Sequence, residues 1–236
     1  MLMTLLLPFS TPSSTVKDLV SFTNLPTSLQ QSSTHSGPSS KAKFIDGLTD
    51  KWRMHALDKA GLCFKNYPLA LYAVDVTFQQ TNASAGSFAE KKRFFRKKHS
   101  LYGMKVEASV LPNGYAINVS NAVPGSLADI TICYDNNAFH QYMLTKVGYA
   151  TTMPDNGNLG NEYPNSGALL ADKGYQGLYR HMRAITPAKR HAGGLLSVPE
   201  MTANDRIASD RVVVEHFFRA IEDTLDHHER VVLLEA

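Results

Sequence analysis

The chain has 236 residues and a mass of 26.0 kDa, and 43% of its residues are apolar, which suits one domain with a real core. Its formal charge of +3 and pI of about 8.8 permit a nucleic-acid partner without requiring one. No run reaches the roughly eighteen apolar residues that cross a bilayer, and residues 1–9 lack the basic region of a secretory signal. The two cysteines, Cys63 and Cys133, have no paired spacing, so neither a disulfide framework nor a structural zinc site is predicted.

The first part of the chain is predicted to lie outside the folded domain. Between residues 10 and 40 nearly half of the residues are Ser or Thr, a composition that buries too little apolar area to offset the entropy of ordering. Residues 1–44 are therefore predicted as a disordered tail, and residues 45–68, with apolar spacing through Trp52 and Leu57, as a short helical remnant. The folded domain is predicted over residues 69–226, and residues 227–236 as a C-terminal tail.

Three consecutive antiparallel strands are predicted to open the domain. LALYAVDVTFQQ (69–80) is rich in β-branched and aromatic residues, and YGMKVEASVL (102–111) alternates in polarity. YAINVS (115–120) follows after Asn113-Gly114, a strong hairpin signal.

The second half alternates predicted helices with one further strand. A helix is expected within residues 125–147 with Ser126 as its N-cap, followed by a surface loop over 151–165. ALLAD (168–172) predicts a short strand, QGLYRHMRAI (176–185) a helix, and residues 187–195 a basic loop. Apolar residues at helical spacing predict a closing helix from about Ser209. This order indicates an α/β fold with a mixed sheet.

Three acids stand in apolar surroundings. Asp75 lies within the first strand, Asp172 directly follows the ALLA run, and Glu215 interrupts the apolar helix RVVVEHFF. In open α/β sheets ligands collect beyond the strand ends, and an isolated buried carboxylate is costly unless it is paired or binds a cation. These acids predict one convergent site.

The chemistry that suits such a site is phosphoryl transfer on nucleic acid. Carboxylates hold two divalent cations roughly 3.5–4 Å apart, one activating a water or hydroxyl and the other stabilising the leaving oxygen. Oxygen ligands favour Mg²⁺ or Mn²⁺ over zinc.

Each acid also has a plainer interpretation. Asp75 is equally compatible with a solvent-facing edge strand, Asp172 with the opening of the turn DKGY, and Glu215 with an ion-pair ladder to Arg211 and Arg219. Asp129 is a fourth acid, either an auxiliary of the site or a helix first-turn residue that suits the helix dipole.

Two basic segments are candidate phosphate contacts, and either can instead be ordinary surface charge. KKRFFRKK also has the composition of a nuclear-localisation patch, so a nuclear protein is expected. The candidate DNA-binding residues are Lys91, Lys92, Arg93, Arg96, Lys97, Lys98, Lys189 and Arg190.

Six blocks in order carry a family resemblance: AVDVTFQQ, SLYGMKVEASVLPNGYAINV, VPGSLAD, ALLADKGYQG, ITPAKR and SDRVVVEHFF. They resemble the DDE superfamily endonuclease domain of PIF/Harbinger-like transposases. The resemblance implies an RNase H-like fold, a catalytic and metal-binding triad of Asp75, Asp172 and Glu215, a divalent Mg²⁺ or Mn²⁺ cofactor, and DNA as substrate.

The chain departs from this family at both ends. A Ser/Thr-rich stretch stands where relatives carry a helical DNA-binding region, so a separate DNA-binding protein is an expected partner. Two functions therefore stay open: a metal-dependent DNA endonuclease or transposase, and a degenerate or domesticated relative that binds DNA or a protein without cleavage. A nucleotide-binding protein is disfavoured because no Gly-rich phosphate loop occurs.

Overall fold

The computed structural model describes residues 51–82, 87–97, 100–190 and 193–234, with side chains described up to residue 223. The predicted disordered tail and Lys98 lie outside the described residues. No helix in the described ranges is both long enough and apolar enough to cross a membrane. The elements are, in chain order, α3 Met54–Lys59, β1 Ala70–Gln80, α4 Phe88–Phe94, β2 Phe95–Arg96, β3 Leu101–Val110, β4 Ala116–Val119, β5 Val123–Pro124, α5 Asp129–Asp135, α6 Asn137–Leu144, η2 Gly148–Thr151, β6 Ala168–Leu170, η3 Lys173–Tyr175, η4 Leu178–Arg180, β7 Ala184–Ile185 and α7 Val198–Leu234.

A mixed sheet of seven strands forms the centre of the fold, with the path β2-β3-β1-β6-β7 and with β4 and β5 also paired to β3. β1 pairs antiparallel with β3, and β3 pairs antiparallel with β4, so the predicted antiparallel pairing of these three strands is confirmed. Gly114 has a φ of +86° in the turn between β3 and β4, which explains why glycine follows Asn113 there. β6 and β7 add in parallel on the other side of β1.

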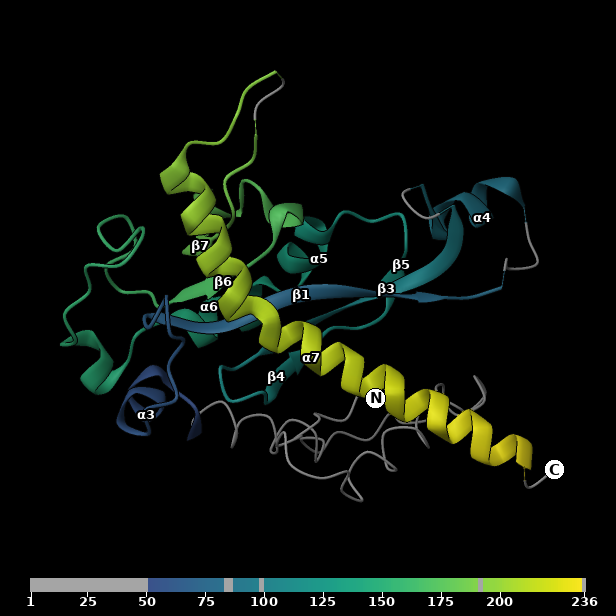
Figure 1. The fold of residues 1–236 in the computed structure, drawn as a ribbon, viewed down its shortest axis with the longest axis horizontal. Helices are drawn as coiled ribbons and strands as arrows, with labels where there is room; N and C mark the ends of the chain where they lie inside the picture. The colour runs from purple at the N-terminus through teal and green to yellow at the C-terminus, as the bar shows by residue number, and fades with distance from the viewer. Residues whose placement is uncertain (1–50, 83–86, 98–99, 191–192, 235–236) are drawn as a thin grey trace.

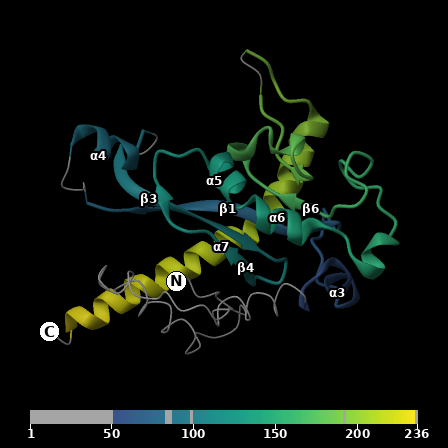
Figure 2. The same cartoon turned by 180° about the vertical axis from the view of Figure 1, so that it is seen from behind.

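Helices cover both faces of this sheet. α7 crosses one face over β1 and β3, and α5 and α6 lie on the other (Figures 1 and 2). The side chains of β1 alternate accordingly, because successive residues of a strand point to opposite faces. Ala73 belongs to the core cluster under α7, whereas Tyr72 and Val74 belong to the cluster that includes residues of α5 and α6. This is an α/β RNase H-like architecture, as predicted.

The closing helix begins earlier than predicted. α7 starts at Val198, not near Ser209. Ser197 and Glu200 form reciprocal bonds at its start: the Ser197 backbone N–H donates to Glu200 Oε2 (2.8 Å) and the Glu200 N–H donates to Ser197 Oγ (3.4 Å). The sequence SVPE carries this capping-box spacing, with Pro199 in the first turn.

Asp210 fastens α7 to the chain that enters β1. Its Oδ2 accepts the backbone N–H groups of Asn66 (2.9 Å) and Tyr67 (3.0 Å). The start of β1 and the middle of α7 are therefore fixed to each other, which matters because both elements contribute to the site described below.

Two other helix predictions were wrong in part. The segment 125–147 contains two helices, α5 and α6, separated at Asn136, and α5 is preceded by Ala128 without a side-chain cap from Ser126. The segment 176–185 forms only the short 3₁₀ turn η4 and then strand β7. Gly177 has a φ of +94°, which helices do not accommodate, and it ends any helical continuation there.

Arg183, the residue before β7, is fully buried, and its charge is matched by one acid. Its guanidinium donates to both carboxylate oxygens of Asp155, and Lys146 Nζ lies 2.6 Å from Asp155 Oδ2. Burial raises the pKa of Asp155, but the hydrogen bonds from Arg183 and Lys146 outweigh it and hold that pKa well below its ordinary value. The ionised Asp155 stabilises the fold at pH values above its pKa in the unfolded chain. This stabilisation is lost as the pH falls through the lower pKa that Asp155 has in the folded protein.

Replacing Asp155 with asparagine is expected to lower the free energy of unfolding by about 3–5 kcal/mol, because it leaves the buried Arg183 charge unpaired. Urea unfolding at neutral pH measures this loss. A loss below about 1 kcal/mol would show that Arg183 finds another partner.

Candidate active site

Asp75 and Asp172 lie at equivalent positions along two neighbouring parallel strands, Asp75 within β1 and Asp172 just after β6. The last registered pair of β1 and β6 is Ala73 with Leu170, and each acid follows two residues later. Asp75 Oδ1 accepts the backbone N–H of Val76 (2.8 Å). Asp172 has extended backbone geometry and caps η3, its Oδ1 accepting the N–H of Gly174 (2.6 Å). Asp172 therefore both opens a turn and lies beyond the end of a strand, so the two interpretations of its position are compatible.

Asp129 lies beside Asp172, as the first residue of α5. A Cβ atom built on Gly174 would lie 2.6 Å from Asp129 Oδ2 and 2.9 Å from Asp172 Oδ1, so these two carboxylates flank the same glycine. Any larger residue would push them apart, which accounts for glycine in the DKGY turn. Lys105 Nζ, on β3, binds the other Asp129 oxygen at 2.9 Å.

The pKa of Asp75 is raised by its burial and by the neighbouring acids. Burial is the largest cause that raises it, and the charges of Asp172 and Asp129 raise it further. Arg211 and the Val76 N–H act in the opposite direction, and the pKa of Asp75 ends at about 6, above its ordinary 3.8. The protonated form therefore stabilises the fold at acid pH, and this contribution is lost as the pH rises through about 6.

Arg211 of α7 reaches Asp75 from the opposite side of the sheet plane to α5. Its Nη2 lies 2.6 Å from Asp75 Oδ2, and the side chain is only 8% exposed. Among the described residues, the buried Arg211 Nε has no hydrogen-bond partner. Arg211 is thus engaged with Asp75, and it is not the helix-ladder partner of Glu215 that the sequence left open.

Glu215 lies one helical turn after Arg211 on α7 and is exposed. Within the described part of the chain it forms no ion pair shorter than 4.0 Å. The structure therefore brings together Asp75, Asp172 and Asp129 and leaves Glu215 on the neighbouring turn of α7. From the sequence, Arg211 was recognisable only as a flank of Glu215, and nothing in the spacing indicated its contact with Asp75.

The donor set of the three aspartates fits a hard divalent cation. All its potential ligands are carboxylate oxygens, the kind that Mg²⁺ and Mn²⁺ prefer, and mutual repulsion among them is what a bound cation relieves. Asp75, Asp129 and Asp172 do not have their oxygens all within 4.8 Å of one another. Over the described ranges that criterion is met by one group, Glu107, Cys133 and His140.

This second cluster is fully buried and its polar atoms are hydrogen-bonded. Glu107 Oε1 accepts from Asn136 Nδ2 (3.0 Å) and lies 3.2 Å from His140 Nε2. Tyr72 Oη lies 2.8 Å from the other ring nitrogen, His140 Nδ1. Burial and the charge of Glu107 raise the pKa of the Cys133 thiol. The geometry indicates a hydrogen-bonded core network.

The network reaches the acidic site through Tyr175. Its hydroxyl donates to Glu107 Oε2 (3.0 Å), and Tyr175 belongs to η3, the turn that Asp172 caps. Glu107 of β3 therefore holds the turn that carries Asp172. Glu107 was not predicted from the sequence as a functional residue, although it interrupts a strand just as Asp75 does.

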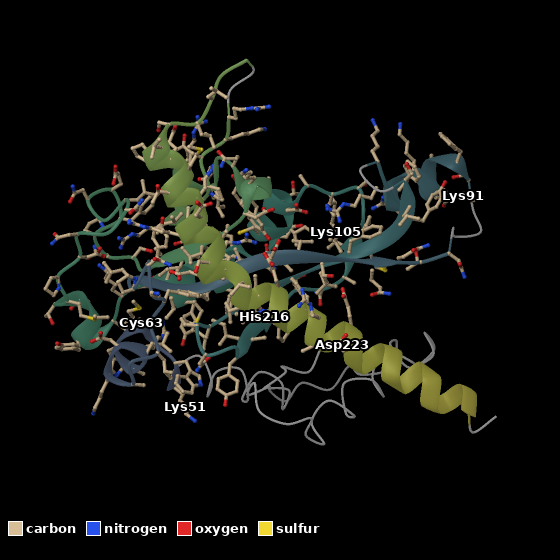
Figure 3. All side chains as sticks on the ribbon, viewed as in Figure 1. Lys51, Cys63, Lys91, Lys105, His216 and Asp223 are labelled. Atoms are coloured by element: carbon tan, nitrogen blue, oxygen red, sulfur yellow. The ribbon has the colours of Figure 1, made fainter. Side chains whose placement is uncertain are left out.

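The basic candidates lie on two parts of the molecule. Residues 91–96 of the KKRFFRKK run lie in α4 and β2, and Figure 3 shows Lys91 on this outer part and Lys105 between it and the centre of the sheet. Ser87 and Glu90 form a capping box at the start of α4. Lys189 and Arg190 are exposed in the segment after β7.

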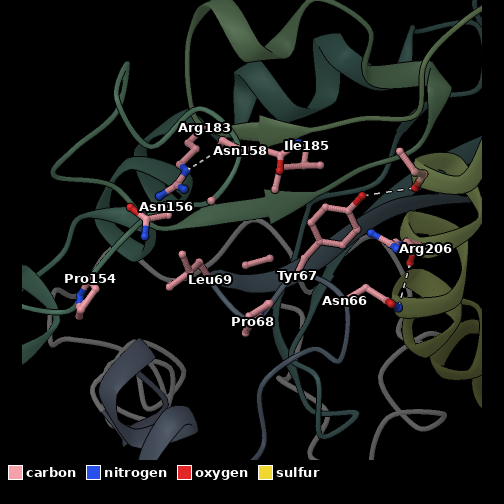
Figure 4. Close-up of a pocket in the computed structure, with 13 residues that line it drawn as sticks. Asn66, Tyr67, Pro68, Leu69, Pro154, Asn156, Asn158, Arg183, Ile185 and Arg206 are labelled. Atoms are coloured by element: carbon pink, nitrogen blue, oxygen red, sulfur yellow. Dashed lines mark hydrogen bonds between the residues drawn. The ribbon is translucent and has the colours of Figure 1, made fainter. Parts of the chain in front are cut away.

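A cavity of about 570 Å³ opens at the other end of β1 (Figure 4). Leu69, Tyr67 and Ile185 line it, and Arg183 Nε donates to Asn158 O (2.8 Å) at its wall. The cavity borders Ala70, the first residue of β1, whereas Asp75 lies near the middle of that strand. It is therefore separate from the acids.

An RNase H-like sheet with one carboxylate within β1 and another just beyond the end of β6 defines a nuclease-type α/β protein. The comparison with protein families agrees: the model of the DDE superfamily endonuclease family matches residues 74–226, nearly two thirds of the chain. The chain therefore belongs to the DDE superfamily endonuclease family. Neither the curated proteins nor the solved structures gave a significant match.

Proposed function

We propose that the protein is a divalent-metal-dependent DNA endonuclease of transposase origin, of the PIF/Harbinger-like type, that hydrolyses phosphodiester bonds or transfers strands. The observation that carries the proposal is the convergence of Asp75, within β1, and Asp172, just after the parallel strand β6, with a pKa of Asp75 raised to about 6. Perturbed carboxylates gathered at the end of an α/β sheet mark catalytic sites.

In this proposal Asp75 and Asp172 hold Mg²⁺ or Mn²⁺, and Glu215 completes the triad from α7. The cation, when bound, supplies Lewis-acid stabilisation of the phosphate and lowers the pKa of a coordinated water. Arg211 holds Asp75 in place, at 2.6 Å, and neutralises part of the acidic charge. Asp129, held by Lys105, supplies a further carboxylate next to Asp172.

The basic residues are proposed to contact DNA phosphates. α4 and β2 present Lys91, Lys92, Arg93 and Arg96, Lys97 follows directly after β2, and the segment after β7 presents Lys189 and Arg190. The same basic run suits a nuclear protein, and recognition of a target sequence is proposed to involve a separate DNA-binding partner.

Incubation of the full chain with supercoiled plasmid tests the activity. Nicked or linear product is expected with Mg²⁺ or Mn²⁺ and none with EDTA. The Asp75→Asn variant should lose this activity, whereas Asp223→Asn, the same change at an exposed acid of α7 (Figure 3), should retain it. Cleavage by Asp75→Asn at the wild-type rate would contradict the assignment.

Metal binding is expected to release a proton near pH 6. Because the pKa of Asp75 is about 6, roughly half of its carboxyl groups are protonated there, and a cation requires the ionised form. The apparent affinity should rise about tenfold per pH unit below about 6 and level off above about 7. Calorimetry in buffers of different ionisation enthalpy measures the released proton; an affinity unchanged from about pH 5 to 7 would contradict the role of Asp75.

A second function is favoured by the contact between Arg211 and Asp75. A relative that binds DNA or a protein without cleavage would keep this ion pair permanently, with Glu215 exposed and apart. Such a protein would retard DNA in EDTA and in Mg²⁺ alike and produce no nicked plasmid in either.

A further inference from the structure

A groove between α4 and the sheet combines aromatic walls with an open mouth. Its volume is about 630 Å³, within the range of small-ligand sites. Phe88, Phe95 and Tyr102 line it, and the Phe88 side chain is 80% exposed. The rings of Phe95 and Tyr102 pack at a centroid distance of 5.2 Å, which fixes one wall.

Cations surround these aromatic walls. Lys92, Arg96 and Lys97 all line the groove, and Lys92 and Lys97 are exposed. Arg96 lies over the ring of Phe78, with its guanidinium carbon 5.2 Å from the ring centre, so its position is fixed by the sheet below. The groove thus presents positive charge around an apolar interior, a combination that complements a base joined to a phosphate.

Lys105 connects the groove to the acids. It lines the groove, donates to Leu127 O (2.5 Å) and pairs with Asp129, which flanks Gly174 together with Asp172. Leu127 and Ala128 form the wall directly before Asp129. A nucleic-acid strand that occupies the groove would therefore have its next phosphate beside the carboxylates.

We propose that this groove binds one unpaired nucleotide of the DNA strand, with its base against Phe88, Phe95 and Tyr102 and its phosphate held by Lys92, Arg96 and Lys97. The inference rests on the proposed function, since it names the form of DNA that the same site takes. Bases in a duplex are stacked inside the helix, so the faces of these aromatic side chains are available only to a base that has left the stack.

Fluorescence anisotropy of a labelled single strand of about 10 nucleotides, in EDTA and at fixed salt, tests the groove without cleavage. Phe88→Ala should weaken binding by at least about fivefold, because one stacking partner is lost. Tyr149→Ala, at an aromatic residue of η2 that is also largely exposed, should bind as the wild type does. Binding of a duplex of the same length should not depend on Phe88.

The proposal would be overturned if the wild type and Phe88→Ala bound the single strand with equal affinity. It would also be overturned if Phe88→Ala weakened binding of the duplex as much as binding of the single strand. Single-strand binding is measured in EDTA, where no cleavage occurs, so its failure is distinguishable from failure of the nuclease assignment, which the plasmid assay with Mg²⁺ tests. A protein that never cleaves DNA but binds single strands through Phe88 would contradict the proposed function alone.

Discussion

Asp172→Asn is expected to lower the rate of metal-dependent DNA cleavage by more than about 100-fold, since even residues that only support a metal ligand contribute about 10–100-fold. The substitution is well matched to the structure. Asparagine retains a side-chain oxygen that can accept the Gly174 N–H, so the cap of η3 is preserved while the negative charge is removed. Single-turnover cleavage measures the effect, and near-wild-type cleavage would exclude Asp172 from the catalytic site.

The same assay identifies the third acid. If Glu215 completes the site, Glu215→Gln should reduce cleavage as strongly as Asp172→Asn, and Asp129→Asn should have a smaller effect. The reverse order would assign the third position to Asp129, which already lies beside Asp172. Thermal unfolding of each variant controls for changes in the fold.

Glu107→Ala is expected to destabilise the protein by about 3–5 kcal/mol. Glu107 is fully buried and receives hydrogen bonds from Asn136 and Tyr175 as well as its contact with His140. Removing it leaves these groups without an acceptor in the core. It also releases Tyr175 and so loosens the turn that holds Asp172. Urea unfolding at neutral pH measures the loss of stability.

Cys133→Ala separates a hydrogen-bond network from a structural metal centre. In the network Cys133 contributes packing, so its loss should cost only about 1 kcal/mol. A structural metal held by Glu107, Cys133 and His140 would make the cysteine variant as unstable as Glu107→Ala.

The central strands and two of the acids could be predicted from sequence because their signals are local. Alternation and β-branched residues mark β1 and β3, and Asn113-Gly114 marks the turn that follows. The acid after ALLA indicated a strand end, and the parallel pairing of β1 with β6 places Asp172 beside Asp75. These features depend on neighbours in the chain and on one rule of sheet geometry.

What sequence reasoning missed depends on contacts between distant residues. Helical spacing in residues 176–185 was outweighed by the buried pairing of Arg183 with Asp155 and by the left-handed Gly177. Asn136 interrupts the predicted helix where its side chain binds Glu107. The contact of Arg211 with Asp75 joins residues 136 apart, and no local spacing reports it. The capping box at Ser197 was the exception, since that local signal was present.

A calorimetric titration of Mn²⁺ into the full chain near neutral pH, with Asp172→Asn alongside, tests the metal site at Asp75 and Asp172 most directly. We expect the wild-type protein to bind the cation and the variant, folded to the same extent, not to bind it. Absence of binding by the folded wild-type protein, or equal binding by the variant, would contradict the metal site at Asp75 and Asp172.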